Sequence, residues 1–281
     1  MISSLFPGQV ETATAPVRLD EACVSRFQRQ VTEKGVAMSK SSVGEYLSCP
    51  ARWAFRAVER QAPGPLSDGL RLGRACHQVI ADLLLGAPVG DREAQVARAL
   101  DAQGVSGHLL PSAVDWVLWA HDLVRQRSGR IVAVEHSVKT TALPGVSLAG
   151  RFDLVLAGGS AGDLELLDWG FGRHPRFVKA EQMICDLGTT IYRTLLAVAM
   201  PDRPAQVVIS DVHVPGRQVV SVELDRDEVR RAWVEIQAVR DGMRAVATTG
   251  VAGAKPGRQC SWCPFQRRCP HADLSGADEQ R

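Results

Sequence analysis

Three cysteines lie close together near the C-terminal end of the sequence. Cys260, Cys263 and Cys269 form the pattern Cys-x2-Cys-x5-Cys, in a chain with only seven cysteines among 281 residues. Such spacing is typical of metal ligands. A tetrahedral zinc site or a four-iron cluster takes four ligands, so a fourth must come from elsewhere. Cys49 is the best candidate, because a proline follows it, as one follows Cys263 and Cys269 and the last cysteine of bacterial ferredoxin runs.

A cluster held by all four cysteines would join distant parts of the chain. Linking Cys49 to Cys260 closes a loop of about 210 residues, which restrains the unfolded chain by roughly 5 kcal/mol on the scale derived for disulfides. We therefore expect loss of the cluster to unfold the domain. The alternative is a structural zinc site on the three C-terminal cysteines and His271, with Cys49 buried and inert. The remaining cysteines are expected to be core thiols: Cys23, Cys76 and Cys185.

Two carboxylates interrupt apolar segments of strand length. Asp153 lies in Gly-Arg-Phe-Asp-Leu-Val and Asp168 in Leu-Leu-Asp-Trp. A buried ionised carboxylate is costly unless it is paired or bound to a metal. Adjacent strands would bring both carboxylates to one hard cation, Mg or Mn. The alternative is that each pairs with an arginine, such as Arg151 or Arg173.

His77 is the candidate third ligand. It lies four residues after Gly73 on a predicted helix, so the absent glycine side chain leaves room beside the imidazole. A lone histidine on such a helix is more often a packed core residue than a ligand. The two carboxylates that interrupt apolar strands favour the interpretation of His77 as a metal ligand.

Apolar periodicity and turn residues predict the elements that carry these groups. Strands are expected over 131–138, 146–157, 163–169, 205–214 and 217–224. Helices are expected over 20–34, from 42 toward 49, and over 70–85, 111–127, 179–199 and 225–250. Ser42 with Glu45, and Asp225 with Glu228, are expected to form capping boxes at two helix starts.

The composition excludes several classes of protein. Hydrophobic residues make up 45% and charged residues 23% of the chain, which fits neither a disordered tail protein nor a membrane protein. Residues 1–15 show no secretory signal, and no apolar run approaches the roughly 18 residues of a membrane span. We expect a cytoplasmic protein with reduced thiols. A net charge of +2 is too small to indicate nucleic-acid binding, which would need a local patch.

Taken together, these motifs resemble the RecB-like branch of the PD-(D/E)XK nuclease superfamily. The similarity is to the iron–sulfur exonucleases of CRISPR adaptation and to AddB-type helicase–nucleases, and it covers nearly the whole chain beyond residue 39. Five segments carry it in order: the N-terminal cysteine helix at 41–50, Gly-x-x-x-His at 73–77, the first acidic strand at 150–153, the second at 167–169, and the three C-terminal cysteines.

The resemblance implies an α/β fold of restriction-endonuclease type, with a mixed central sheet flanked by helices. It implies a single domain over 39–272, after a lead-in and short helix at 1–38 and before a polar tail at 273–281. It also implies functional residues: a 4Fe–4S cluster on Cys49, Cys260, Cys263 and Cys269, a divalent metal on His77, Asp153 and Asp168, and Tyr192 in the active site.

The sequence departs from the family pattern at two positions. The family places a lysine two residues after the second acid, where this chain has Gly170. Glycine cannot supply that electrostatic stabilisation, which is typically worth several kcal/mol. The family also places a glutamine four residues before Tyr192, where this chain has Gly188. Metal ions with carboxylates alone keep cleavage possible, and the nearby candidates to replace the lost groups are Arg173, Lys179 and Gln182.

Arginines alternate with aromatic residues around the cysteines, a composition that suits single-stranded nucleic acid. The alternative is that the aromatic rings pack under the cluster and the arginines form a solvated surface. The predicted contacts are Arg52, Trp53, Arg56, Arg258, Arg267 and Arg268, with Phe55, Trp262 and Phe265 beside them.

The sequence therefore leads to two alternative hypotheses about function. The first is an iron–sulfur protein of nuclease fold that binds DNA at single-stranded ends and, if active, cleaves phosphodiesters with Mg or Mn. The second is a catalytically degenerate relative that serves, with protein partners, as a DNA-binding or scaffolding subunit of a repair, recombination or defence complex. A zinc-stapled interaction module is a third, weaker hypothesis, which a brown iron–sulfur protein would exclude.

Overall fold

The structure is a computed structural model of the 281-residue chain. It describes residues 15–62, 67–86, 91–105, 107–143, 145–158, 163–200 and 206–272. Residues 1–14 of the predicted lead-in and the whole predicted polar tail at 273–281 lie outside the described residues. The chain divides into two compact units: unit 1 comprises Met1–Pro65, Thr141–Ser147 and Ile236–Arg281, and unit 2 comprises Leu66–Thr140 and Leu148–Glu235.

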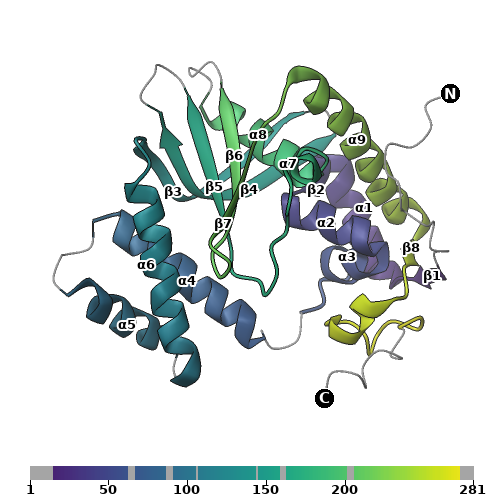
Figure 1. The fold of residues 1–281 in the computed structure, drawn as a ribbon. Coiled ribbons are helices and arrows are strands. Elements are labelled where there is room, and N and C mark those ends of the chain that lie inside the picture. The colour runs from purple at the N-terminus through teal and green to yellow at the C-terminus, as the bar shows by residue number, and fades with distance from the viewer. Residues whose placement is uncertain are drawn as a thin grey trace. The chain divides into compact units, whose positions relative to one another are not determined.

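A mixed sheet forms the centre of unit 2 (Figure 1). Its strands are β3 (Arg130–Leu143), β4 (Val146–Ala157), β5 (Leu164–Gly170), β6 (Val207–His213) and β7 (Gln218–Glu223). Strands β4, β5, β6 and β7 are neighbours in that order, and β3 pairs with β4. The β5–β6 pair is parallel, whereas β4–β5 and β6–β7 are antiparallel. The predicted mixed central sheet is thus confirmed.

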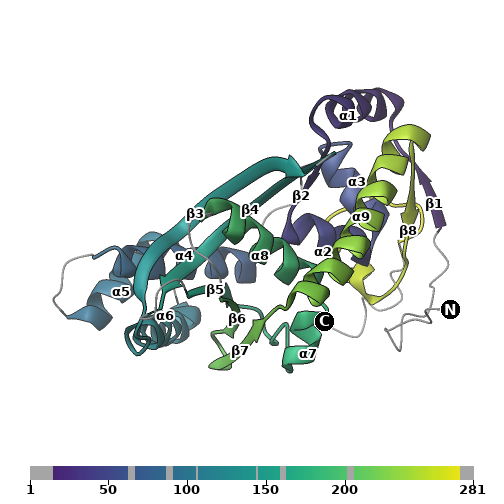
Figure 2. The ribbon, with the colours of Figure 1, turned by 90° about the horizontal axis from the view of Figure 1, so that it is seen from above.

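Three helices pack together against this sheet. They are α4 (Asp68–Leu84), α5 (Arg92–Ala102) and α6 (Leu110–Arg125), which gather beside the strands in Figures 1 and 2. Their apolar faces share one buried core with Leu154, Leu167 and Val212 of the central strands. Helix α5 was not predicted; Asp91 caps it by accepting a hydrogen bond from the backbone N–H of Ala94. The core fixes α4, the helix that carries His77, on the sheet.

The parallel β5–β6 pair needs a crossover connection, because a tight turn can join only antiparallel strands. Helices α7 (Ala180–Ile184) and α8 (Leu187–Ala199) supply it. The predicted single helix over 179–199 is wrong, because Asp186 starts a new helix by accepting the backbone N–H of Thr189 at 2.9 Å. Gly150 of β4 lies under Leu195 and Tyr192 of α8, so the crossover brings Tyr192 to the sheet.

Unit 1 is built from segments far apart in the sequence. Its elements are β1 (Ala15–Arg18), α1 (Glu21–Lys34), β2 (Val36–Met38), α2 (Lys40–Ser48), α3 (Pro50–Ala57), the C-terminal part of α9 (Arg226–Thr249), β8 (Val251–Ala254) and the 3-10 turn η2 (Arg258–Trp262). Strand β1 pairs antiparallel with β8, and Trp53 of α3 packs edge-on against Phe27 and Tyr46. The two ends of the described chain therefore share one core.

The helix starts test the predicted capping boxes. Asp225 and Glu228 exchange backbone-to-side-chain hydrogen bonds of 2.7 and 2.8 Å, as predicted. The box predicted for Ser42 and Glu45 is wrong, because α2 begins earlier and Ser39 is its N-cap, with Ser42 as the reciprocal partner. Glu45 instead forms ion pairs with Arg52 and Arg56. None of the described helices is long and apolar enough to cross a bilayer.

Gly35 ends α1 with a φ of 72°, a left-handed conformation that favours glycine. A Cβ atom at this position would lie 2.6 Å from the backbone carbon of Gly145. Gly44, within α2, has nothing within 4 Å of such an atom.

We expect Gly35→Ala to lower the free energy of unfolding by about 2 kcal/mol or more, because it adds left-handed strain to a backbone clash. Gly44→Ala, the matched control, should raise it by up to about 1 kcal/mol through helix propensity. Urea unfolding with unchanged m values measures both. Equal stability of the two variants would contradict the tight turn.

Candidate functional site

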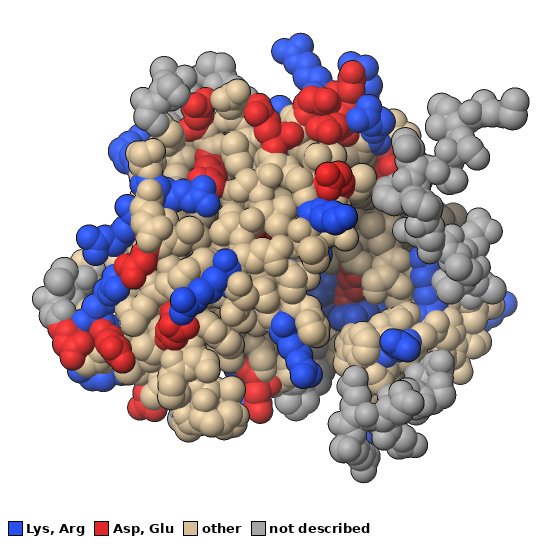
Figure 3. Space-filling model, in the orientation of Figure 1, with Lys and Arg blue, Asp and Glu red and all other residues tan. Residues whose placement is uncertain are grey.

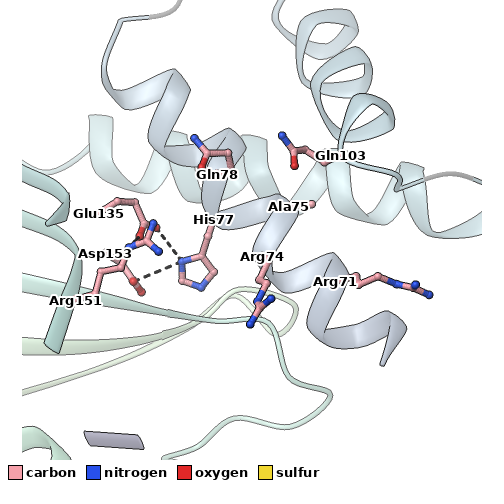
Figure 4. Close-up of a pocket in the computed structure, with 9 residues that line it drawn as sticks. All are labelled: Arg71, Arg74, Ala75, His77, Gln78, Gln103, Glu135, Arg151 and Asp153. Carbon is pink, nitrogen blue, oxygen red and sulfur yellow. Dashed lines mark hydrogen bonds and ion pairs between the residues drawn. The ribbon is translucent and has the colours of Figure 1, made fainter. Parts of the chain in front are cut away.

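His77 projects from α4 toward two acidic residues of the sheet (Figure 4). Its Nδ1 atom lies 3.1 Å from Oε1 of Glu135 on β3 and 3.5 Å from Oδ1 of Asp153 on β4. The ring packs edge-on against Phe171, 5.3 Å between centroids, and Gly73 lies beside the same phenylalanine. Helix packing therefore fixes the imidazole with one nitrogen facing the carboxylates.

The atoms of His77, Glu135 and Asp153 that could bind a metal all lie within 4.8 Å of one another. Among the described residues, no other three histidine, cysteine or acidic side chains meet so closely. Sequence reasoning predicted His77 and Asp153 but missed Glu135. The available signal was one acidic residue in the apolar run Ile-Val-Ala-Val-Glu. The backbone of Glu135 has a φ of 47°, which is rare in a strand and common at functional sites.

Asp168 of β5 lies beside this set but outside it. Its Oδ2 atom is 2.6 Å from Nη2 of Arg176, and its Oδ1 atom is 3.5 Å from the hydroxyl of Tyr192. The neighbouring Trp169 donates its backbone N–H to Oδ2 of Asp153 at 2.8 Å. Asp211 of β6 stands directly opposite Asp168 in the parallel pairing and also forms an ion pair with Arg176. Sequence reasoning missed both Asp211 and Arg176.

Burial and crowding of charge shift the titration of this site. Burial, and then the charge of Asp168, raise the pKa of Asp153 to about 7, although His77 opposes the shift. Burial disfavours the charged ring of His77, but the bond to Glu135 and the charges of Asp153, Glu135 and Asp168 raise its pKa. Burial and the charges of Asp168 and Asp153 raise the pKa of Tyr192, so its phenol stays protonated and can donate a hydrogen bond.

A cavity of about 730 Å³ opens beside His77, Glu135 and Asp153. Figure 4 shows the residues that line it. Besides His77, Ala75 and the two acidic residues, its lining is basic or amide-bearing: Arg71, Arg74, Gln78, Gln103 and Arg151. Nε of Arg151 lies 2.5 Å from Oε2 of Glu135. A metal ion at the acidic end and phosphate oxygens among the arginines would match these charges.

The four predicted cluster cysteines line one small cavity in unit 1. Cys49 lies between α2 and α3, Cys260 in η2, and the other two in the turns that follow. Burial, and more weakly the charges of Cys49 and Cys260, raise the pKa values of Cys263 and Cys269. His271, the alternative zinc ligand, places Nε2 3.0 Å from the carbonyl oxygen of Pro16.

The residues predicted to contact nucleic acid differ in how far they are buried and in what they contact. Trp53 is 2% exposed and offers no face to a nucleotide in this conformation, and Phe55 is buried against Phe265. Both observations favour the alternative that these rings form core. Arg268 pairs with Glu59, and Trp262 is exposed. A nucleic-acid role for Arg52, Arg56, Arg258, Arg267 and Arg268 stays a prediction.

Comparison with known proteins shows the family. The family model described as "PD-(D/E)XK nuclease superfamily" matches residues 37–270. No curated protein matches. A solved structure named "Putative exonuclease" from Eubacterium rectale is similar, with a TM-score of 0.53, 9% identity, and coverage of 94% of this chain and 98% of that one. LHK-Exo in complex with dAMP matches more weakly, with a TM-score of 0.28, 13% identity, and coverage of 64% and 92%.

The family model covers most of the chain, and it includes the α4 histidine, both predicted acidic strands and all four cluster cysteines. The likeness to the Eubacterium rectale structure independently supports the same fold. The chain therefore belongs to the PD-(D/E)XK nuclease superfamily.

Proposed function

We propose that this protein is a metal-dependent deoxyribonuclease that hydrolyses phosphodiester bonds at single-stranded DNA ends. The observation that carries the proposal is the meeting of His77, Glu135 and Asp153 at one end of a cavity whose other lining groups include arginines. One imidazole and two carboxylates suit a hard divalent cation, Mg or Mn. When bound, the cation would polarise the phosphate and lower the pKa of water.

The chain's own residues have separate tasks in this proposal. His77, Glu135 and Asp153 hold the cation, and Asp168 lies alongside as a further acidic group. Tyr192 donates toward Asp168 and orients it. The arginines of the cavity bind the phosphates of the strand. Over α4–α6, basic and acidic side chains are interspersed in Figure 3, so we assign strand binding to the groups in the cavity.

A second candidate function is a non-catalytic DNA-binding or scaffolding subunit with protein partners. The observation that favours it is the pairing of Asp168 with Arg176, together with glycine at positions 170 and 188. An arginine on this carboxylate competes with a metal for the same oxygen atoms. Cleavage itself separates the two candidates.

We further propose that Cys49, Cys260, Cys263 and Cys269 hold a 4Fe–4S cluster, as in the RecB-like iron–sulfur branch, in a cytoplasmic protein. Four thiols lining one cavity support a shared ligand. Four thiols suit either a four-iron cluster or a tetrahedral zinc ion, and the resemblance to the RecB-like iron–sulfur branch favours the cluster.

Manganese-dependent degradation of end-labelled single-stranded DNA by anaerobically purified protein tests the nuclease. We expect Glu135→Gln and Asp153→Asn each to lower the rate by at least about 100-fold, the size typical of losing one electrostatic stabiliser. Asp115→Asn, an exposed carboxylate of α6, should leave it unchanged. No cleavage by folded, metal-binding wild-type protein would favour the second candidate.

The stability of the metal-free protein should report the raised pKa of Asp153. The pKa of Asp153 is about 7 in the folded protein, against a reference value of 3.8. Between these values the folded state binds a proton that the unfolded state has lost, so stability falls as the pH rises from about 4 to 7. In EDTA, Asp153→Asn should therefore gain stability over the wild type across this window and hold a constant advantage above it. A difference independent of pH, measured by urea unfolding, would contradict the shift.

Iron and sulfide analysis tests the cluster. Anaerobically purified protein should be brown and contain about four iron atoms per chain. Cys260→Ser should lose iron and lower the melting temperature, because the cluster joins segments of unit 1. Cys185→Ser is the matched control and should keep both, because Cys185 is exposed and the expectation that it is a core thiol is wrong. Colourless protein loaded with zinc would exclude the cluster.

A further inference from the structure

Asp168 and Asp211 place two negative charges side by side in the sheet. They stand opposite each other on the parallel strands β5 and β6, and their exposed fractions are 7% and 3%. Two like charges in such surroundings cannot both stay ionised without a cation, because burial and mutual repulsion each favour the protonated form.

Arg176 supplies that cation. It lies between β5 and α7, and its Nη2 atom contacts Asp168 Oδ2 at 2.6 Å, the Asp168 carbonyl oxygen at 3.3 Å, and Oδ1 of Asp211. Although burial opposes the charge, the two carboxylates raise the pKa of Arg176. Its guanidinium is therefore both charged and held in one place.

Gly170 lies next to this guanidinium. A Cβ atom at position 170 would lie 3.9 Å from both Nε and Nη2 of Arg176. The guanidinium thus lies beside the position from which a side chain at the end of β5 would extend. The candidates suggested by the sequence are placed otherwise: Gln182 accepts the backbone N–H groups of Val178 and Lys179 at the start of α7, and Arg173 is exposed.

The guanidinium carries more donors than those on Nη2. Nη2 contacts Asp168 and Asp211, and Nε and Nη1 carry further N–H groups. The side chain is 37% exposed, so a bound ligand can contact it. Each of these N–H groups can donate a charge-assisted hydrogen bond to a phosphate oxygen.

We propose that Arg176, held by Asp168 and Asp211, donates to the scissile phosphate and supplies the positive charge that Gly170 cannot. The inference rests on the proposed function, because it needs a phosphodiester bound beside His77, Glu135 and Asp153. Asp211 is then a positioning residue, which acts through the arginine that it holds.

The experiment separates the guanidinium from the buried charge that it balances. Arg176→Gln alone leaves two neighbouring carboxylates and can fail to fold, so the main variant is Arg176→Gln with Asp211→Asn, which removes one charge of each sign. Arg176→Gln with Gly170→Lys moves the cation to position 170. Arg173→Gln, an exposed arginine of the same segment, is the control.

Three quantities are measured for each protein: the melting temperature, the affinity for a single-stranded oligonucleotide in non-cleaving Ca²⁺, and the single-turnover cleavage rate in Mn²⁺. For Arg176→Gln/Asp211→Asn we expect a folded protein with a rate lower by at least about 100-fold and an affinity weaker by about 10-fold. Moving the cation to position 170 should recover at least about 10-fold of the rate. The control should match the wild type.

The outcomes distinguish this inference from the proposed function. A folded Arg176→Gln/Asp211→Asn variant that cleaves as fast as the wild type overturns the role of Arg176 and leaves the nuclease intact. A wild type that binds the oligonucleotide without cleaving it overturns the nuclease. In that case the affinity for the oligonucleotide tests the role of Arg176. Equal affinity of the wild type and the Arg176→Gln/Asp211→Asn variant overturns that role. A wild type that neither binds nor cleaves overturns both.

Discussion

One carboxylate on each of four adjacent strands is the constraint that the rest of unit 2 must meet. Glu135, Asp153, Asp168 and Asp211 come from β3, β4, β5 and β6 respectively, and all four are largely buried. Charges concentrated in this way favour unfolding unless partners are built around them. The surrounding helices and loops carry the residues that pair with these carboxylates.

The partners arrive from elements that packing holds firmly. Helix α4 shares the core of α5, α6 and the central strands, which fixes His77 against Glu135 and Asp153. The crossover required by the parallel β5–β6 pair carries both remaining partners: the segment after β5 contains Arg176, and α8 contains Tyr192. The connection that the sheet topology demands is therefore also the source of the groups that balance Asp168.

Sequence patterns predicted the helices and strands better than they predicted which charged residues pair. Strand β4 was predicted over the residues that the structure gives it, because a long apolar run bounded by turns has few other solutions. Glu135 was missed because one acidic residue in a strand reads as a solvent-facing position. Arg176 and Asp211 were missed because their pairing depends on the parallel register of β5 with β6, and no local periodicity encodes register between distant strands.

The two halves of the carboxylate row are balanced by different means. On the β5–β6 side a resident guanidinium contacts both Asp168 and Asp211 and offsets one of their two negative charges at all times, because arginine does not lose its proton in proteins. On the β3–β4 side, Glu135 pairs with the exposed Arg151 and Asp153 faces His77, whose charge depends on pH. A pKa of about 7 for Asp153 shows that burial and the charge of Asp168 leave this carboxylate short of positive charge. A divalent cation would relieve that shortage most at Asp153, so the site holds its ligands ready at a cost in stability that the cation itself removes.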